Sequence, residues 1–251
     1  SVRANIFEDG SSEIIFSDIT KQEKTKQLKQ ELTGNIAHEL RTPITSIRGY
    51  LETVLSQPLD DEKKHYFIER AFQQTVALSE IIQDMSLIAK MEEAPDLFVL
   101  EKINLERILQ KIKEEVSAQL NLKHIEMKWQ LSDNLTLTGN ANLLYSLFKN
   151  LTDNTIRYAG ENIKINISLY NEDANFYYFS FYDTGIGIKE ESHLNRIFER
   201  FYRINEGRTR DTGGSGLGLS IVKNAVLFHK GKITAKNRKE GGLEFLFTLK
   251  R

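Results

Sequence analysis

The chain has 251 residues, 34 of them basic and 35 acidic, and its formal net charge of -1 excludes a global field that would attract a polyanion such as nucleic acid. Hydrophobic residues make up 40% of the chain, enough for the core of one large domain or two modest ones, which excludes a mainly disordered state. The absence of cysteine removes disulfides, thiolate nucleophiles and cysteine-ligated zinc.

The N-terminal end carries no basic-then-apolar signal, and no apolar stretch reaches the roughly 18–20 residues that span a bilayer. The chain begins at Ser1, so we expect a soluble fragment whose only membrane contact is through a segment upstream. Residues 14–19 are expected to form one strand. The run EIIFSDIT resembles the last strand and exit motif of a PAS sensor domain, with an ordinary strand or an expression remnant as the alternative.

Helical patterns follow, and prolines separate them. Lys, Glu and Gln dominate residues 21–31, which predicts a linker helix or a coiled coil. Two apolar stripes with helical spacing lie on either side of Pro58, the second ending before Pro95. Their short connection predicts an antiparallel hairpin, and a second copy of the chain would cover both stripes in a four-helix bundle. The stripes consist of Ile36, Leu40, Ile44, Ile47, Leu51 and Val54, then Phe67, Ala71, Leu78, Ile81, Ile82, Met85 and Ile88.

His38 lies on the first hairpin helix, two residues from an apolar position on either side, which turns it about 200° away from the stripe. Glu39 is adjacent, and Thr42 shares the face of His38. Pro43 removes the backbone donor for the Glu39 carbonyl, which predicts a local bend. An exposed imidazole beside a carboxylate suits a nucleophilic histidine, although a solvated surface histidine is the alternative.

From about residue 103, helices alternate with strands whose side chains alternate between apolar and polar. The pattern predicts an α/β sandwich with helices on one face of a sheet. The expected strands cover residues 125–131, 163–169, 176–182, 232–236 and 244–249, and the expected helices cover residues 105–120, 142–158 and 215–228.

A polar face on the helix at 142–158 carries Asn150, Asn154 and Arg157 at offsets of four and three residues. Amide oxygens suit a hard cation such as Mg²⁺, and a guanidinium suits phosphate oxygens. A solvated helix face is the alternative.

Two glycine-rich turns come after this helix. Asp183 ends an aromatic strand before Gly185 and Gly187, so its carboxylate is placed to accept a hydrogen bond from an exocyclic amine such as that of adenine, with a simple tight turn as the alternative. The run GGSGLGLSIV then leads into an apolar helix and aims backbone N–H groups at an anion. The charged segment between the turns reads as a mobile lid with phosphate-binding arginines, or as a plain flexible loop. Its arginines include Arg200, Arg203, Arg208 and Arg210.

These motifs resemble those of the sensor histidine kinases of two-component signalling, over nearly all of the chain. HELRTP looks like the H box of the HisKA dimerisation and phosphotransfer domain. The other motifs are similar to the boxes of the GHKL-type ATP-binding domain and stand in the family's order: NLTDNTIRY is the N box, DTGIGI the G1 box, IFERFYR the F box and GGSGLGLSIV the G2 box.

The resemblance implies an all-α helical hairpin that forms a dimeric four-helix bundle, followed by an α/β sandwich of the GHKL type. It implies that the chain forms a homodimer, that this fragment is cytoplasmic and that the full-length protein is anchored in the bacterial inner membrane. The implied domains are a C-terminal remnant of a PAS-like domain at 1–20, a signalling linker helix at 21–34, a HisKA domain at 35–95 and the ATP-binding domain at 96–251.

The resemblance also implies an ATP-dependent protein-histidine kinase with Mg²⁺ as cofactor. His38 would accept the γ-phosphoryl group of ATP with Glu39 as general base, and the group would then pass to an aspartate on the receiver domain of a response regulator. Thr42 matches the position that family members use to orient water when they dephosphorylate the regulator.

For the nucleotide, the resemblance implies that Asn154 helps to hold Mg²⁺, that Asp183 recognises the adenine amine and that Tyr158 packs near the base. Arg157 and Arg203 would contact phosphates. The remaining positions carried over from the motifs are Asn150, Gly185, Gly187, Gly214, Gly216, Leu217 and Gly218.

Two departures from the family's pattern concern the nucleotide. Thr155 stands where alanine is usual, and Arg157 where lysine is more common, so we expect an altered nucleotide affinity and a working site. Two rival functions stay open: a catalytically silent ATP-binding signalling scaffold, and a conformational ATPase that shares the GHKL pocket. The intact His38 favours the kinase.

Overall fold

The computed structural model describes residues 2–7, 12–16, 18, 20–132, 135–204 and 214–251. The chain divides into two units, residues 1–75 and 76–251, which we describe separately. Expectations for residues 205–213, including Arg208 and Arg210, lie outside the described residues. Within the described ranges, no helix combines the length and the apolar character needed to cross a membrane.

A short hairpin opens the first unit. Strand β1 (Val2–Ile6) pairs antiparallel with β2 (Ser12–Phe16), so that Val2 lies opposite Phe16. The expected strand at 14–19 therefore begins earlier, at Ser12. Sequence analysis missed β1, although Val2, Ala4 and Ile6 alternate with polar residues.

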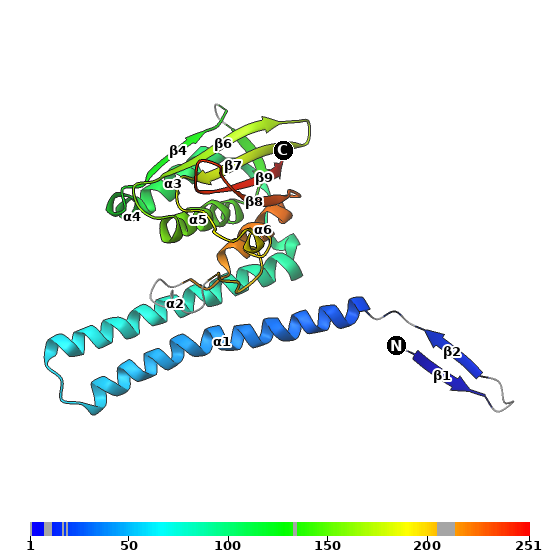
Figure 1. Cartoon of the computed structure of the whole chain (residues 1–251), viewed down its shortest axis with the longest axis horizontal. Helices are drawn as coiled ribbons and strands as arrows, with labels where there is room; N and C mark the ends of the chain where they lie inside the picture. Colours follow the sequence, from blue (N-terminus) through cyan, green and yellow to red (C-terminus); the bar gives the residue numbers. More distant parts are fainter. Residues whose placement is uncertain (1, 8–11, 17, 19, 133–134, 205–213) are drawn as a thin grey trace. The chain divides into compact units, whose positions relative to one another are not determined.

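Two long helices form the predicted antiparallel hairpin (Figure 1). Helix α1 (Thr20–Ser56) continues through Pro43, so that the expected linker and the first hairpin helix are one helix. Helix α2 (Asp61–Glu93) follows a connection that contains Pro58, and Asp60 caps its first turn by accepting the Lys63 N–H at 2.8 Å. The rings of Tyr50 and Phe67 lie 6.1 Å apart across the hairpin.

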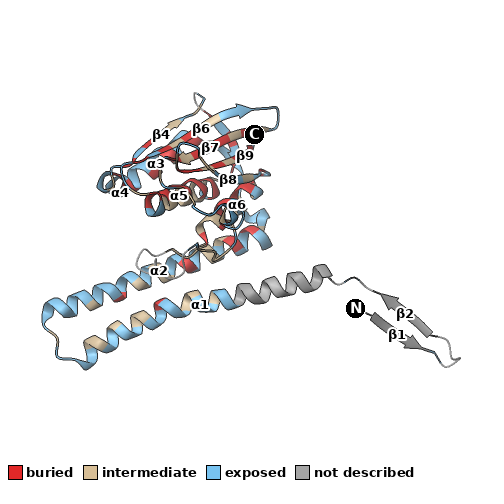
Figure 2. Ribbon diagram, in the orientation of Figure 1, coloured by how far each residue is buried: buried red, intermediate tan, exposed pale blue. Residues whose placement is uncertain are grey.

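The described part of α1 is mostly exposed (Figure 2). Ile44 and Leu51, both members of the predicted stripe, keep about half of their surface exposed, and Leu55 is exposed as well. These side chains line a shallow apolar groove together with Ile47. One chain alone therefore leaves the stripe uncovered.

A mixed sheet of five strands forms the second unit, in the order β4-β6-β7-β9-β8. Strand β4 is parallel to β6, and all other neighbours are antiparallel. The strands confirm the expected segments with small shifts at their ends: β4 (Glu126–Gln130), β6 (Lys164–Glu172), β7 (Phe176–Asp183), β8 (Ile233–Asn237) and β9 (Leu243–Lys250). A separate short pair, β3 (Glu101–Asn104) with β5 (Thr136–Gly139), was not expected.

Helices cover one face of this sheet (Figure 1). Helix α5 (Ala141–Tyr158) packs beside α6 (Gly218–Phe228) and also contacts α3 (Leu105–Glu115). Aromatic rings fill the layer between sheet and helices: Phe148 of α5 lies 5.8 Å from Phe247 of β9, which stacks on Phe179 of β7 at 5.4 Å. Buried residues gather in this layer in Figure 2. The predicted α/β architecture is thereby confirmed.

Two helix predictions were wrong in part, one at an internal break and one at its start. The helix expected at 105–120 breaks at Val116 into α3 and α4 (Ser117–Leu122), because the Ser117 hydroxyl bonds the Glu114 carbonyl at 2.7 Å and competes with the helical pattern. The helix expected from residue 215 begins at Gly218, since Gly216 has a φ of +69°, which no right-handed helix contains.

Candidate functional site

His38 on α1 faces solvent, as its position opposite the apolar stripe predicted. Its side chain is 65% exposed, and its Nδ1 lies 3.7 Å from Oε1 of Glu39. The Thr42 hydroxyl donates to the His38 carbonyl at 3.2 Å, one turn along the same face. This part of the helix therefore presents an imidazole, a neighbouring carboxylate and a hydroxyl together.

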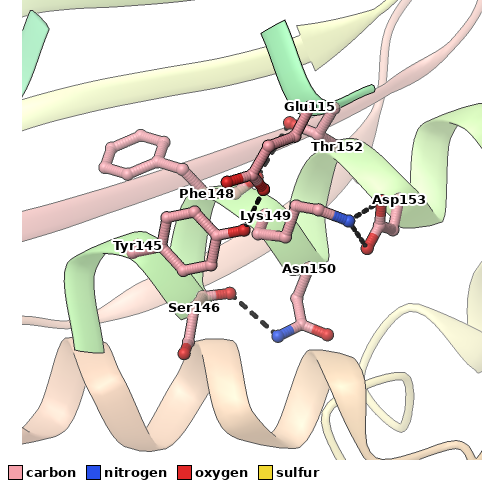
Figure 3. Close-up of polar contacts among 8 residues, drawn as sticks. All are labelled: Glu115, Tyr145, Ser146, Phe148, Lys149, Asn150, Thr152 and Asp153. Carbon is pink, nitrogen blue, oxygen red and sulfur yellow. Dashed lines mark hydrogen bonds and ion pairs between the residues drawn. The ribbon is translucent and has the colours of Figure 1, made fainter. Parts of the chain in front are cut away.

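The polar face of α5 is shaped by contacts within the helix (Figure 3). Asn150 donates its Nδ2 hydrogen to the Ser146 carbonyl at 2.8 Å, which fixes the amide and leaves its Oδ1 free of that bond. Lys149 pairs with both carboxylate oxygens of Asp153, at 2.5 and 2.6 Å. The charge of Asp153 is thus compensated by its own helix.

Asn154 follows one turn after Asn150 and is half-buried. Its side chain makes no hydrogen bond with any residue in the described ranges, so its amide oxygen is available to a ligand. Amide oxygens are ligands for Mg²⁺, which also takes substrate phosphates and water. No group of three or more His, Asp or Glu that could hold a metal by itself occurs in the described part. A cation brought in with phosphates fits this donor set.

The C-terminal end of α5 meets the second glycine-rich turn. A Cβ added to Gly214 would lie 2.9 Å from the Tyr158 hydroxyl and 3.1 Å from Nη1 of Arg157. Both side chains are exposed. The turn therefore lies close to the Tyr158 ring and the Arg157 cation, which precede it in the sequence by more than fifty residues.

Asp183, at the end of β7, is 3% exposed. Burial raises the pKa of its carboxyl group, and backbone N–H groups oppose that shift. The N–H groups of Gly185 and Leu243 donate to its Oδ1 at 2.8 and 3.4 Å. Both hydrogen bonds end on Oδ1, so Oδ2 is the oxygen left for a ligand.

Close backbone approaches explain the glycines after Asp183. A Cβ on Gly185 would lie 2.2 Å from the Ala159 carbonyl oxygen at the end of α5. Gly187 has a φ of +63°, and a Cβ there would lie 2.8 Å from Oδ1 of Asn237, which accepts the Ile188 N–H at 2.9 Å. The turn is thereby held between α5 and β8.

The N-terminal end of α6 lies against Asn150. A Cβ on Gly218 would be 2.6 Å from the Oδ1 atom of Asn150, so a side chain at this position would displace the Asn150 amide. Leu217 before it is buried and donates its N–H to the Ser215 hydroxyl at 3.2 Å. The first-turn N–H groups of a helix favour anions such as phosphate. Asn150 and the N-terminal end of α6 therefore lie side by side, and Asn154 follows one turn further along α5.

The F-box segment is attached to the same turn. The Phe201 N–H donates to the Gly216 carbonyl at 3.0 Å, and Phe201 itself adopts a left-handed φ of +61°. Arg203, two residues on, is half-buried.

Sequence reasoning missed several residues around Asp183. A Cβ on Gly242, whose φ is +93°, would lie 2.0 Å from the Asp183 carbonyl oxygen. Arg238 stacks over the Tyr182 ring at 4.0 Å and reaches the Asp183 carbonyl at 3.4 Å. Arg238 and Gly242 follow the end of β7 by 55 and 59 positions, so neither the periodicity nor the motif spacing indicated them.

Two contacts from the C-terminal half of α2 were also missed. The Ser215 hydroxyl donates to Oδ2 of Asp84 at 3.5 Å, and Arg200 forms an ion pair with Glu92. Burial and the nearby Glu80 raise the pKa of Asp84 to about 6. In the sequence, only the acidic side chains on an otherwise apolar face of α2 could have indicated these two contacts.

Two known families match this chain. Residues 28–94 match the His Kinase A (phospho-acceptor) domain, and residues 139–251 match the family of histidine kinase-, DNA gyrase B- and HSP90-like ATPases. His38 lies in the first match, and Asn150 to Gly218 lie in the second.

Curated relatives are sensor proteins. The phosphate regulon sensor protein PhoR of Pseudomonas aeruginosa is 30% identical over 222 residues, which cover 88% of this chain and 49% of that protein. The sensor histidine kinase WalK of Bacillus subtilis is 31% identical over 244 residues, 96% of this chain and 39% of that protein. The chain thus spans half or less of the length of these relatives.

Solved structures show the same fold. The histidine kinase AdeS of Acinetobacter baumannii matches with a TM-score of 0.66 at 24% identity, over 85% of this chain and 96% of that one. The histidine kinase ThkA, solved in complex with the response regulator protein TrrA, matches with a TM-score of 0.66 at 22% identity, over 99% of this chain and 74% of that one.

Proposed function

Because the chain belongs to the sensor histidine kinases of two-component signalling, we propose that it transfers the γ-phosphoryl group of ATP to His38 and then to an aspartate of a response-regulator receiver domain. The observation that carries this proposal is the exposed His38 imidazole with the Glu39 carboxylate 3.7 Å from its Nδ1. An imidazole that must meet two successive partners has to be accessible, and its attack is favoured by a neighbouring base.

The chemical step follows from this pair. Nε2 of His38 uses its lone pair to form the bond to the γ-phosphorus, the bond from that phosphorus to the bridging oxygen of ADP breaks, and the Nδ1 proton passes to Glu39. The phosphohistidine then gives its phosphoryl group to the carboxylate of the regulator, which restores the imidazole. Thr42, on the same face, is the residue we assign to orienting water in the separate phosphatase reaction, in which water takes the phosphoryl group from the regulator's aspartate and releases inorganic phosphate.

The nucleotide would be held in the second unit. The availability of Oδ2 on buried Asp183 supports recognition of the adenine amine, with Tyr158 near the base. Arg157, Arg203 and the N–H groups at Gly214–Gly218 would hold phosphates, and Asn150 and Asn154 would border the metal. Mg²⁺ bound with ATP, which Asn154 would hold through its amide oxygen, supplies neutralisation of the charge on the transferring group.

We propose a homodimer formed by the hairpin. The apolar groove on α1 and its half-exposed Ile44 and Leu51 support this assembly, because a C2 partner would bury the same stripe on both chains in a four-helix bundle. A response regulator would dock on the face around His38. We keep the domain limits 1–20, 21–34, 35–95 and 96–251 as part of the proposal.

The location is proposed from the chemistry and from the relatives. ATP and the receiver domains of response regulators occur in the cytoplasm, so we place this part of the protein there. PhoR is named a sensor protein, and by resemblance to the family we place the full-length protein at the bacterial inner membrane.

Incubation with γ-labelled ATP and Mg²⁺ tests the function. We expect acid-labile, alkali-stable label on the parent chain, no label on His38→Ala or Asn154→Ala, and full label on the matched control His65→Ala, which changes an exposed histidine on α2. Label that survives His38→Ala would remove His38 as the acceptor. ATP binding without label would favour the silent scaffold, and steady release of free phosphate without label would favour the conformational ATPase.

A further inference from the structure

Thr155 on α5 has a buried hydroxyl without a partner. The residue is 2% exposed, and its Oγ1 makes no hydrogen bond with any described residue. Thr152, also buried on this helix, donates its hydroxyl to the Phe148 carbonyl at 2.8 Å. The environment of α5 therefore permits the usual bond back to the helix, and Thr155 does not use it. A buried polar group left unpaired opposes folding, so its presence calls for a ligand that pairs it.

The position of Thr155 relates it to Asp183. Residues four apart share one face of a helix, which puts Thr155 one turn before Ala159 on the same side. The Ala159 carbonyl accepts the N–H of Ile186 at 3.2 Å and comes close to Gly185. The Ala159 end of this face thus abuts the turn that begins at Asp183. The Oδ2 atom of Asp183 is not used by the backbone N–H groups that bind Oδ1.

We infer that Thr155 is a base-specificity residue, and this inference rests on the proposed ATP site. Its hydroxyl donates, directly or through one ordered water, to the purine ring nitrogen that adjoins the exocyclic amine accepted by Asp183. The two side chains then offer an acceptor and a donor side by side.

The base that fits this pair is adenine. Its exocyclic amine donates and the adjacent ring N1 accepts, which complements the carboxylate and the hydroxyl. Guanine presents the reverse order, a carbonyl oxygen beside an N–H, so its carbonyl oxygen would face the Asp183 carboxylate acceptor to acceptor. A site whose buried polar group lacks its partner rejects such an analogue more strongly than a site that merely changes shape.

Because Thr155 stands where alanine is usual, the hydrogen bond to the purine ring nitrogen is available to this chain. An alanine side chain carries no donor, so the nucleotide is bound there without this hydrogen bond. The hydroxyl therefore adds to an existing site, and we expect a contribution of about fivefold to tenfold in affinity, the size of one neutral hydrogen bond.

Nucleotide binding by the full chain tests the inference, with three variants measured by calorimetry and by thermal unfolding without nucleotide. Thr155→Val keeps the shape and removes the hydroxyl, Thr155→Ser keeps the hydroxyl, and Thr152→Val is the matched control on a hydroxyl paired within α5. The ligands are ATP and 1-deaza-ATP, in which a C–H replaces the ring N1, both with Mg²⁺.

We expect Thr155→Val to bind ATP fivefold to tenfold more weakly, to bind 1-deaza-ATP as the parent does, and to unfold at the same or a higher temperature without nucleotide. Thr155→Ser should keep most of the ATP affinity, and Thr152→Val should keep the ratio between the two ligands. An unchanged ATP affinity in Thr155→Val, or an equal loss for both ligands, would overturn the role of Thr155 while leaving the kinase proposal intact. A parent chain that does not bind ATP would overturn the proposed function itself.

Discussion

Gly216 lies against the backbone of Phe201. A Cβ at Gly216 would come within 2.8 Å of both the Cα and the carbonyl carbon of Phe201, while the Gly216 carbonyl accepts the Phe201 N–H at 3.0 Å. Both residues adopt left-handed φ angles, +69° and +61°. The F-box segment is therefore held to the glycine-rich turn by a backbone contact that tolerates no side chain.

Replacement of Gly216 by alanine should separate these segments. The substitution adds the cost of a left-handed φ, about 1 kcal/mol, to a clash with backbone atoms that cannot move aside. We expect at least a tenfold loss of ATP affinity by calorimetry with the sheet unit still folded by circular dichroism. Gly160→Ala is the control, because Gly160 has a φ of +109° with nothing within 4 Å of its Cβ position. Equal losses of affinity in both variants would assign the effect to φ alone.

Asp183→Asn should separate base recognition from folding. An amide oxygen can replace Oδ1 as acceptor for the N–H groups of Gly185 and Leu243, whereas the NH₂ group in place of Oδ2 would face the adenine amine donor to donor. Since burial already raises the pKa of Asp183, the neutral amide is tolerated in the fold. We expect ATP binding to weaken by ten- to a hundredfold in a fluorescence titration, with a change in unfolding free energy below about 1 kcal/mol. A large loss of stability would make Asp183 a structural residue.

Asp84 should make nucleotide binding depend on pH. Burial and Glu80 raise its pKa to about 6, while the Ser215 hydroxyl, which donates to Oδ2 of Asp84, and the charge of Arg157 favour the ionised carboxylate. The carboxyl group is therefore mostly protonated below pH 6 and ionises as the pH rises through 6, which buries a negative charge beside Ser215. Above pH 6 the Asp84 anion attracts Arg157. Because we assign Arg157 to the phosphates, this attraction should weaken nucleotide binding.

Asp84→Asn mimics the protonated form at every pH. We expect it to bind ATP about threefold more tightly than the parent at pH 7.5 and equally at pH 5.5, an effect of about 0.7 kcal/mol. Taking the ratio of the two proteins at each pH removes the titration of ATP itself. A ratio that does not change with pH would show that Asp84 has no such role.

His229 should make the fold sensitive to acid. Its Nδ1 bonds the Ala225 carbonyl at 2.7 Å, and its Nε2 accepts the Asn140 N–H at 3.1 Å, so the buried ring is neutral. Burial lowers its pKa, and the unfolded chain therefore binds more protons below pH 6.5. Stability is full above that pH and falls as the pH decreases through 6.5, by about 1 kcal/mol at pH 5.5.

Urea unfolding of the parent and His229→Gln at pH 7.5 and 5.5 measures this effect. Glutamine can accept the Asn140 N–H but takes up no proton, so the variant should be less stable at pH 7.5 and should lose less stability on acidification. If both proteins lose the same free energy between the two pH values, other groups are responsible.

The long helices and the strand positions could be predicted because they depend on periodicity over many residues. Exposure of His38 followed from its offset to the apolar stripe in the same way. The break at Val116 could not, since it arises from a single local hydrogen bond of Ser117. Strands β3 and β5, with four residues each, are too short for alternation to mark them.

The motifs located the candidate site, but the sequence could not supply its surroundings. Gly242 and Arg238 reach Asp183 from a later turn, and Asp84 reaches Ser215 from α2, so these contacts depend on tertiary packing. Thr155 was visible as an unusual residue. That its hydroxyl lacks a partner is a property of the folded interior alone.

The hydrogen bond between His229 and Asn140 joins the C-terminal end of α6 to the start of α5, at the ends of both helices that lie away from the glycine-rich turns. The helix pair is thus fastened at one end, while its other end carries Gly218, Tyr158 and the segment around Phe201. Local opening should follow the same gradient, with backbone amides near Asn140 exchanging with deuterium slowly and those after Leu217 exchanging fast. Nucleotide would then slow exchange only at the end that carries Gly218 and Tyr158, so that binding changes the local stability of one end of the pair and leaves that of the other end unchanged.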